Sequence, residues 1–215
     1  MAGLPAPKVK WYNEANTMEV TEWNAGVVDA GSYSRPDDPT IPDDPNFPST
    51  FLIWNNRYDP VSNPTGNTKD VSDMLNVTIT TLSLVRDANG NIDPNLSYQP
   101  TGGVADKTQA VVQVIFFDSS KNNGQGEWGT YDSNNVWRPN TWREIGGNDK
   151  CPVVVCAGSA GNPPAYNTIS GKANTGNVNV DKQNYAKVKM RLYVKPTALA
   201  GKIEWITRVS YTYEG

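Results

Sequence analysis

The segment YAKVKMRLYV, residues 185–194, is the most regular stretch of this 215-residue chain. Its even-numbered positions are all apolar, whereas its odd-numbered positions carry two tyrosines, two lysines and an arginine. This alternation predicts a β-strand with one buried face and one cationic and aromatic face.

A second strand is predicted shortly after the first. Residues 195–201, KPTALAG, form a turn around Pro196 and Gly201. In residues 202–213 the side chains of one face are mostly apolar, namely Ile203, Trp205, Val209, Tyr211 and Tyr213. A connection of about seven residues suits either a hairpin or a crossing between two sheets.

The upstream sequence predicts more strands and no amphipathic helix. Residues 109–117 are apolar at nearly every position, as in a strand that is covered on both faces. In residues 74–85 the apolar positions change parity, which predicts a β-bulge or a strand break near Thr80. Shorter strands are expected at residues 9–12, 18–23 and 50–55. The chain also has 18 glycines and 16 prolines, so we expect many turns and a single all-β sandwich domain over residues 1–215.

Three irregular regions accompany the predicted strands. They are an N-terminal arm (1–17), a Pro/Asp-rich insertion (34–49) and a loop-rich excursion (118–176) that is dense in Gly, Asn, Pro and Trp. Short strands are expected inside the excursion, because its connections are too long to lack structure altogether.

The order of these motifs resembles immunoglobulin-like β-sandwich modules. The residues that carry the resemblance are Trp23, Gly26, Val28, Gly31, Phe51, Ile53, Asn55, Pro196 and Gly201. With its WNN and NVTIT segments, the same order is similar to that of bacteriophage structural proteins, over about half the chain. The resemblance implies an immunoglobulin-like sandwich with long loop insertions. It also implies a non-catalytic virion component, made in the host cytoplasm, whose partners are copies of itself or other virion proteins.

Composition argues against several other functions. A net charge of −3 and a pI near 5.0 do not favour nucleic-acid binding, which needs a basic face. No apolar run approaches the roughly 20 residues of a membrane-spanning helix. The first residues lack the pattern of a secretory signal. Histidine is absent, which removes the commonest general base and metal ligand. We therefore expect no catalytic residue, cofactor or metal.

Residues 35–48, RPDDPTIPDDPNFP, contain the unit Pro-Asp-Asp-Pro twice. The carboxylates of Asp37, Asp38, Asp43 and Asp44 are candidate calcium ligands, but the flanking prolines favour an extended geometry that splays them apart. The alternatives are a solvated loop and an arm that contacts a partner.

We favour the arm. Its aspartates suit a cationic surface, such as Lys187, Lys189 and Arg191 of a neighbouring copy, and Ile41 and Phe47 would serve as apolar anchors. On this interpretation, replacing residues 34–49 by a short turn would leave the stability of the isolated domain unchanged.

Three tryptophans in the excursion, Trp128, Trp137 and Trp142, give a second possible interaction surface. Aromatic rings beside polar groups bind sugar rings and flat protein surfaces, so a carbohydrate-binding or adhesin-like module is the alternative function. The same rings would equally fill a satellite core beneath long loops.

Two smaller motifs have ordinary structural explanations. DANGNID, residues 87–93, has oxygen ligands at alternating positions that suit calcium, but its Asn89-Gly90 pair predicts a type I′ hairpin turn. Cys151 and Cys156 are either buried free thiols or, if the chain bends between them, a local disulfide.

Overall fold

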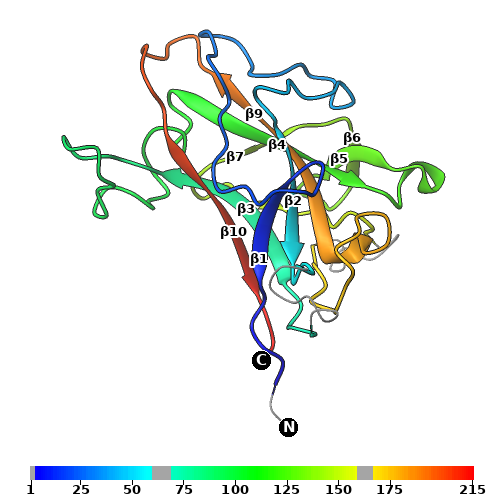
Figure 1. Ribbon diagram of the computed structural model, residues 1–215. Helices are drawn as coiled ribbons and strands as arrows, with labels where there is room; N and C mark the ends of the chain where they lie inside the picture. Colours follow the sequence, from blue (N-terminus) through cyan, green and yellow to red (C-terminus); the bar gives the residue numbers. More distant parts are fainter. Residues whose placement is uncertain (1–2, 60–68, 159–166) are drawn as a thin grey trace.

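Two antiparallel sheets pack face to face in the computed structural model, which describes residues 3–59, 69–158 and 167–215 (Figure 1). Every pairing between strands is antiparallel. The described helices are two 3-10 turns, η1 (Asn122–Gly124) and η2 (Lys182–Asn184). The predicted all-β sandwich is therefore confirmed, while its likeness to immunoglobulin domains stays a prediction.

The larger sheet is built around one long central pair of strands. In spatial order it contains β1 (Val9–Asn13), β2 (Thr50–Asn55), β9 (Tyr185–Val194), β4 (Ala110–Asp118), β5 (Glu127–Tyr131) and β6 (Trp137–Pro139), with β7 (Arg143–Ile145) also paired to β4. Strands β4 and β9 pair from Ala110 opposite Val194 to Phe117 opposite Lys187. This central position explains why the sequence of β4 is apolar at all positions except Gln113 and Asp118.

The smaller sheet contains β10 (Trp205–Thr212), β3 (Leu75–Ser83) and β8 (Cys151–Pro152), in that order. Because β9 lies in one sheet and β10 in the other, the turn around Pro196 and Gly201 is a crossing between sheets, not a hairpin.

The core lies between the two sheets. The even-numbered residues of β9 face it, as their alternation predicted, and Met190 is 1% exposed. Phe51 of β2, Val114 of β4 and Ile79 of β3 are buried in the same cluster. The pattern of β9 thus correctly identified its inner face.

Two details of the strand prediction were wrong. The register shift between β3 and β10 lies at Asn76, which has a φ of 53°, and Thr80 pairs regularly with Arg208. The apolar parity changes because Thr80 and Leu82 are also covered on their own face. Residues 18–23 form only an isolated bridge, Tyr12 to Glu19, because the chain leaves the edge of β1 straight afterwards.

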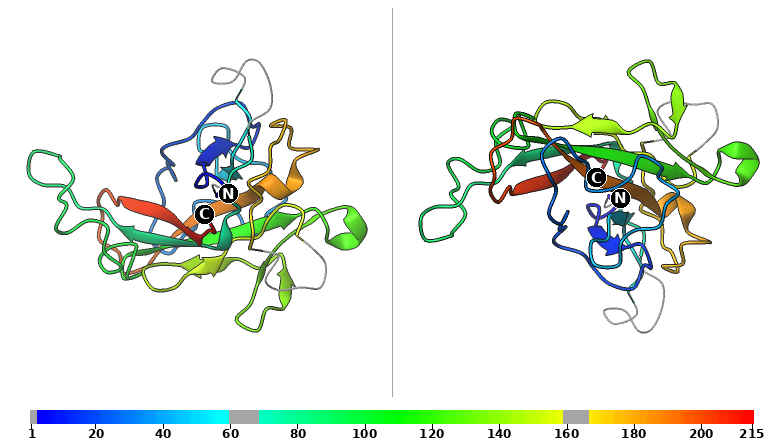
Figure 2. Two further views of the ribbon diagram at one scale, coloured as in Figure 1. Left: turned by 90° about the horizontal axis from the view of Figure 1, so that it is seen from below. Right: turned by 90° about the horizontal axis from the view of Figure 1, so that it is seen from above.

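Both chain ends lie at the same end of the molecule (Figure 1). Ser72 Oγ donates to the carbonyl oxygen of Glu214 at 2.7 Å and lies 3.4 Å from that of Leu4. Within the predicted N-terminal arm (1–17), residues Val9–Asn13 form strand β1 of the larger sheet. Figure 2 shows the termini together and the segment after β3 projecting from the body of the sandwich.

Candidate functional site

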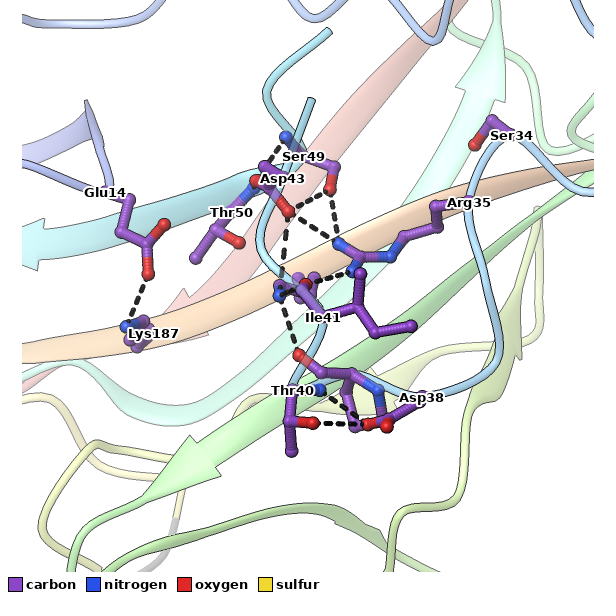
Figure 3. Close-up of polar contacts among 12 residues, drawn as sticks. Glu14, Ser34, Arg35, Asp38, Thr40, Ile41, Asp43, Ser49, Thr50 and Lys187 are labelled. Carbon is purple, nitrogen blue, oxygen red and sulfur yellow. Dashed lines mark hydrogen bonds and ion pairs between the residues drawn. The ribbon is translucent and has the colours of Figure 1, made fainter. Parts of the chain in front are cut away.

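The Pro/Asp-rich segment, residues 34–49, folds over β9 of its own chain. Ser34 N donates to the Leu192 carbonyl at 2.8 Å, and Met190 N donates to the Ser49 carbonyl at 2.9 Å. The two ends of the segment are thus fixed along one edge of β9. Between them, the segment covers the outer, cationic face of this strand (Figure 3).

Asp43 is the centre of the polar contacts under the segment. Its carboxylate accepts hydrogen bonds from Arg35 Nη1 at 2.7 Å and from Ser49 Oγ at 2.8 Å. It also accepts from the backbone N–H groups of Ser49 at 2.7 Å and Thr50 at 2.6 Å. These bonds tie the middle of the segment to its C-terminal end and to the start of β2 (Figure 3).

The surroundings keep Asp43 ionised. Burial alone would raise the pKa of its carboxyl, but the hydrogen bonds from Ser49 and Thr50 and the charge of Lys189 lower it to about 2. At neutral pH the Asp43 carboxylate therefore provides a permanent negative charge for the cations around it.

Lys189 is the first of two buried cations on the outer face of β9, and it is 4% exposed. Its Nζ donates to the carbonyl oxygens of Pro39 at 2.7 Å and Ile41 at 3.1 Å, and lies 3.6 Å from Asp43 Oδ1. Burial and the nearby Arg35 lower the pKa of Lys189, whereas Asp43 opposes that change. Lys189 thus holds the backbone of the segment against the sheet.

Arg191 is the second cation and is also 4% exposed. Its Nε donates to Gln113 Oε1 at 2.7 Å, and its Nη1 donates to Asp37. The guanidinium carbon lies 4.0 Å from the ring centroid of Tyr33 and 4.4 Å from that of Trp142. Trp142 Nε1 in turn donates to the Asp37 carbonyl at 2.7 Å, so ring and guanidinium hold the same residue.

The repeated Pro-Asp-Asp-Pro unit divides its two carboxylates in the same way both times. The first aspartate of each unit, Asp37 or Asp43, binds a buried arginine. The second, Asp38 or Asp44, accepts from the backbone N–H two residues further on at 2.8 Å and is exposed. The first aspartates differ in exposure, because the Asp43 side chain is 10% exposed and that of Asp37 is 85% exposed. Each unit therefore anchors itself with one carboxylate and shapes a local turn with the other.

This arrangement gives two carboxylates of the segment partners within their own chain. Asp43 binds Arg35 and is 10% exposed, whereas Asp37 binds Arg191 and its side chain is 85% exposed. Contact of the segment with a neighbouring copy stays a prediction. The outer face of β9, expected to be open, is buried at Lys189.

The remaining predicted residues of the segment form its outer surface. Ile41 and Phe47 are each 41% exposed, and Asp38 and Asp44 are exposed beside them. Gly26 lies against the Phe47 ring so closely that an added Cβ would be 3.2 Å from it. One face of Phe47 is thus supported from below, and the ring keeps a defined position.

The three tryptophans of the excursion do not form one platform. Trp128 is buried edge-on against Phe117, with Lys189 Nζ 5.1 Å from its ring centroid. Trp142 packs on the Pro/Asp-rich segment, as described above. Trp137 belongs to a different cluster, where its Nε1 donates to Glu127 at 2.7 Å and its ring packs on Tyr131. Their rings are thus used within the chain, as expected for a satellite core.

The DANGNID segment is a hairpin turn, as predicted, but not of type I′. Only Gly90 has a positive φ, of 83°, and Gly90 N donates to the Asp87 carbonyl at 3.0 Å. The Asp87 carboxylate accepts from the backbone N–H groups of Asn89 and Asn91, each at 2.9 Å. No group of three or more acidic or cysteine side chains suited to a metal occurs among the described residues.

Both cysteines are buried free thiols, which excludes the local disulfide. Cys151 lies in the main core, and burial raises its pKa to about 12. Cys156 lies in a second cluster, where its thiol donates to Tyr185 Oη at 3.3 Å.

Sequence reasoning missed three residues of this site: Arg35, Gln113 and Tyr33. Arg35 directly precedes the first Pro-Asp-Asp-Pro unit, so the signal was a cation placed next to a run of carboxylates. Gln113 is the single polar residue among the first seven of the otherwise apolar β4, and it lies opposite Arg191.

No protein-family description, curated protein or solved structure matches this chain. Among the described helices, none is long and apolar enough to cross a membrane.

Proposed function

We propose that this protein is a non-catalytic structural component of a bacteriophage virion, acting by assembly with copies of itself or with other virion proteins. The sequence resemblance supports the virion context. The observation that carries the assembly role is the Pro/Asp-rich segment, which is held in one conformation by buried cations yet displays apolar and acidic side chains to the outside.

Such a surface suits stable protein association. An ordered segment loses little conformational entropy on binding, and its prolines reduce that cost further. The fixed contacts of Lys189 with the Pro39 and Ile41 carbonyls keep the displayed side chains in place before any partner arrives. The segment therefore acts as a preformed docking surface and not as a free arm.

The chemistry of this surface defines its partner. Ile41 and Phe47 offer two apolar contacts, and Asp38 and Asp44 flank them with negative charge. The matching surface on another virion protein would have an apolar depression with lysine or arginine at its rim. A glycan contact stays a prediction. The three tryptophan rings pack within the chain and do not form one common platform for a sugar.

The test is incorporation into particles. Phage particles would be produced in cells that supply the wild-type chain, the double variant Ile41→Ser/Phe47→Ser, or a matched control, Val180→Ser, in which a 68% exposed residue is changed elsewhere. The amount of the chain in purified particles would be measured by quantitative mass spectrometry.

We expect the wild type and the control to be incorporated equally, and the double variant at least about tenfold less, as for loss of two interface anchors. The double variant should still unfold in one cooperative transition, only slightly below that of the wild type, which separates assembly from folding. Absence of the wild-type chain from particles would refute the virion role. Equal incorporation of the double variant would refute the role of this surface.

A further inference from the structure

Strand β10 is an edge strand with little protection, apart from one register shift against β3 between Ser210 and Thr212. It pairs with β3 on one side, from Trp205 opposite Ser83 to Thr212 opposite Leu75. In the described part of the chain no strand pairs with its other side. Natural edge strands are commonly blocked by charges, prolines or bulges. Residues 205–213 contain no proline and one charged residue, Arg208, and are otherwise rich in β-branched and aromatic side chains.

The two sheets are also unequal in width beside this edge. The smaller sheet has three strands, and beside it residues 20–30 also pack on the core, with the Trp23 ring edge-on against Phe51 and Trp205. These residues form one wall of a groove of about 1190 Å³, whose other walls include Met190 of the larger sheet and Trp205 of β10. A further strand beside β10 would extend the smaller sheet along this groove.

We propose that this strand is β10 of a second copy, paired antiparallel about a two-fold axis at Ile206. In that register Glu204 of each copy lies opposite Arg208 of the other, so the contact contains two complementary charge pairs. Trp205 lies opposite Thr207 of the second copy, with both side chains on the groove side. The two small sheets become one continuous six-stranded sheet.

The charges favour this register over one with the two-fold axis at Val209. A two-fold axis at Val209 would pair the whole of β10, but it would place Glu204 opposite Glu214 of the second copy, and like charges opposite each other destabilise a sheet.

The two charged residues are available for this pairing. Arg208 is exposed, and no ion pair joins it to another described residue. Glu204 already binds Arg86 at 3.0 Å and Lys202 at 3.1 Å, but a carboxylate can accept about four hydrogen bonds.

This dimer adds a second, separate surface to the proposed assembly role, and its argument does not rest on the virion context. The β10 edge belongs to the smaller sheet, whereas the Pro/Asp-rich segment covers the outer face of the larger one. Failure of one surface therefore leaves the other unaffected.

The first experiment is sedimentation of the purified chain over a range of concentrations. We expect a monomer–dimer equilibrium whose Kd rises about tenfold or more in Arg208→Glu, because two attractive pairs become repulsive. Adding Glu204→Arg to this variant restores opposite charges across the axis and should recover most of the affinity. Lys150→Glu, an equal charge change at an exposed position away from β10, is the matched control and should dimerise like the wild type.

The second experiment tests the register. Residues directly opposite in an antiparallel pair have Cα atoms about 4.5–5.5 Å apart, within reach of a disulfide. Ile206→Cys should therefore form a disulfide-linked dimer on oxidation, whereas Ser210→Cys, which lies opposite Lys202, should not. The native thiols are buried and will not interfere.

A chain that stays monomeric at millimolar concentration would overturn the proposal, even if β10 then captured an extended peptide of another virion protein. A dimer that withstands Arg208→Glu and gives no Ile206→Cys cross-link would overturn it equally.

Discussion

Arg35 Nη1 donates to the Asp43 carboxylate at 2.7 Å, at a place where the two side chains are only 7% and 10% exposed. Taking both charges out of water costs free energy that their attraction only partly returns, so such a pair adds little net stability. Removing one partner is different, because it leaves the other charge buried and uncompensated. The main effect of the ion pair is therefore to hold the Pro/Asp-rich segment in one conformation, and its net contribution to stability is small.

Asp43→Asn should destabilise the fold by about 3 kcal/mol, since Arg35 and Lys189 would remain buried without their counter-charge. Chemical denaturation followed by tryptophan fluorescence measures this change. Asp44→Asn is the matched control, because Asp44 is the exposed aspartate of the same repeated unit and its loss should cost less than about 0.5 kcal/mol. Equal effects of the two substitutions would contradict the division of roles between them.

The contribution of Asp43 to the free energy of unfolding should be lost in acid. The pKa of Asp43 in the folded state is about 2, below the ordinary value near 3.9 of an unfolded chain. The unfolded state thus takes up the proton first, and the stabilisation from Asp43 is complete above about pH 4 and lost as the pH falls to about 2.

The comparison with Asp43→Asn isolates this contribution. Other aspartates also have lowered pKa values, among them Asp70, Asp87, Asp106 and Asp132, so both proteins will lose stability in acid. The difference between their unfolding free energies should shrink from pH 5 to pH 2. A difference that stays constant over this range would show that Asp43 does not titrate as described.

Local patterns were enough to predict much of the fold. The alternation in β9 identified its buried face, and the apolar run of β4 showed that both of its faces are covered. The turn at Gly90 was predicted too, but the predicted type I′ was wrong, because Asn89 does not have the positive φ that this type requires. Periodicity depends on which side of a strand is covered, and that information is local to the strand.

The site was harder to predict, because its contacts join distant parts of the sequence. The alternation of β9 placed Lys189 and Arg191 on a polar face, yet residues about 150 positions earlier bury that face. Nothing in either segment alone shows that the carboxylates and the cations of one chain satisfy each other. The same aspartates suggested an intermolecular contact for this reason.

The two thiols should be unreactive in the native protein. Burial raises the pKa of Cys151 to about 12, and that of Cys156 is raised as well, so little thiolate is present at pH 8. A thiol reagent such as DTNB should titrate two groups rapidly in denaturant and react at least about 100-fold more slowly without it. A reducing agent should leave the melting temperature unchanged. A thiol count below two in denaturant would indicate a disulfide.

Replacing residues 35–48 by a short Gly-Ser turn should cost less stability than the single substitution Asp43→Asn. The ends of the segment, Ser34 and Ser49, pair with Leu192 and Met190 along one edge of β9, so a few residues can join them. The replacement removes Arg35 and Asp43 together and returns the cations of β9 to water, where they need no counter-charge.

The replacement loses the packing of Trp142 and Tyr33 on the segment but gains from a shorter loop, so we expect a net cost of about 1–2 kcal/mol. This prediction replaces the expectation from sequence that stability would be unchanged. Chemical denaturation of the replacement variant and of Asp43→Asn under the same conditions shows directly which of the two has the lower free energy of unfolding. A replacement variant that is several kcal/mol less stable than Asp43→Asn, or that does not fold, would show that the segment is an integral part of the sandwich and not a separate surface element.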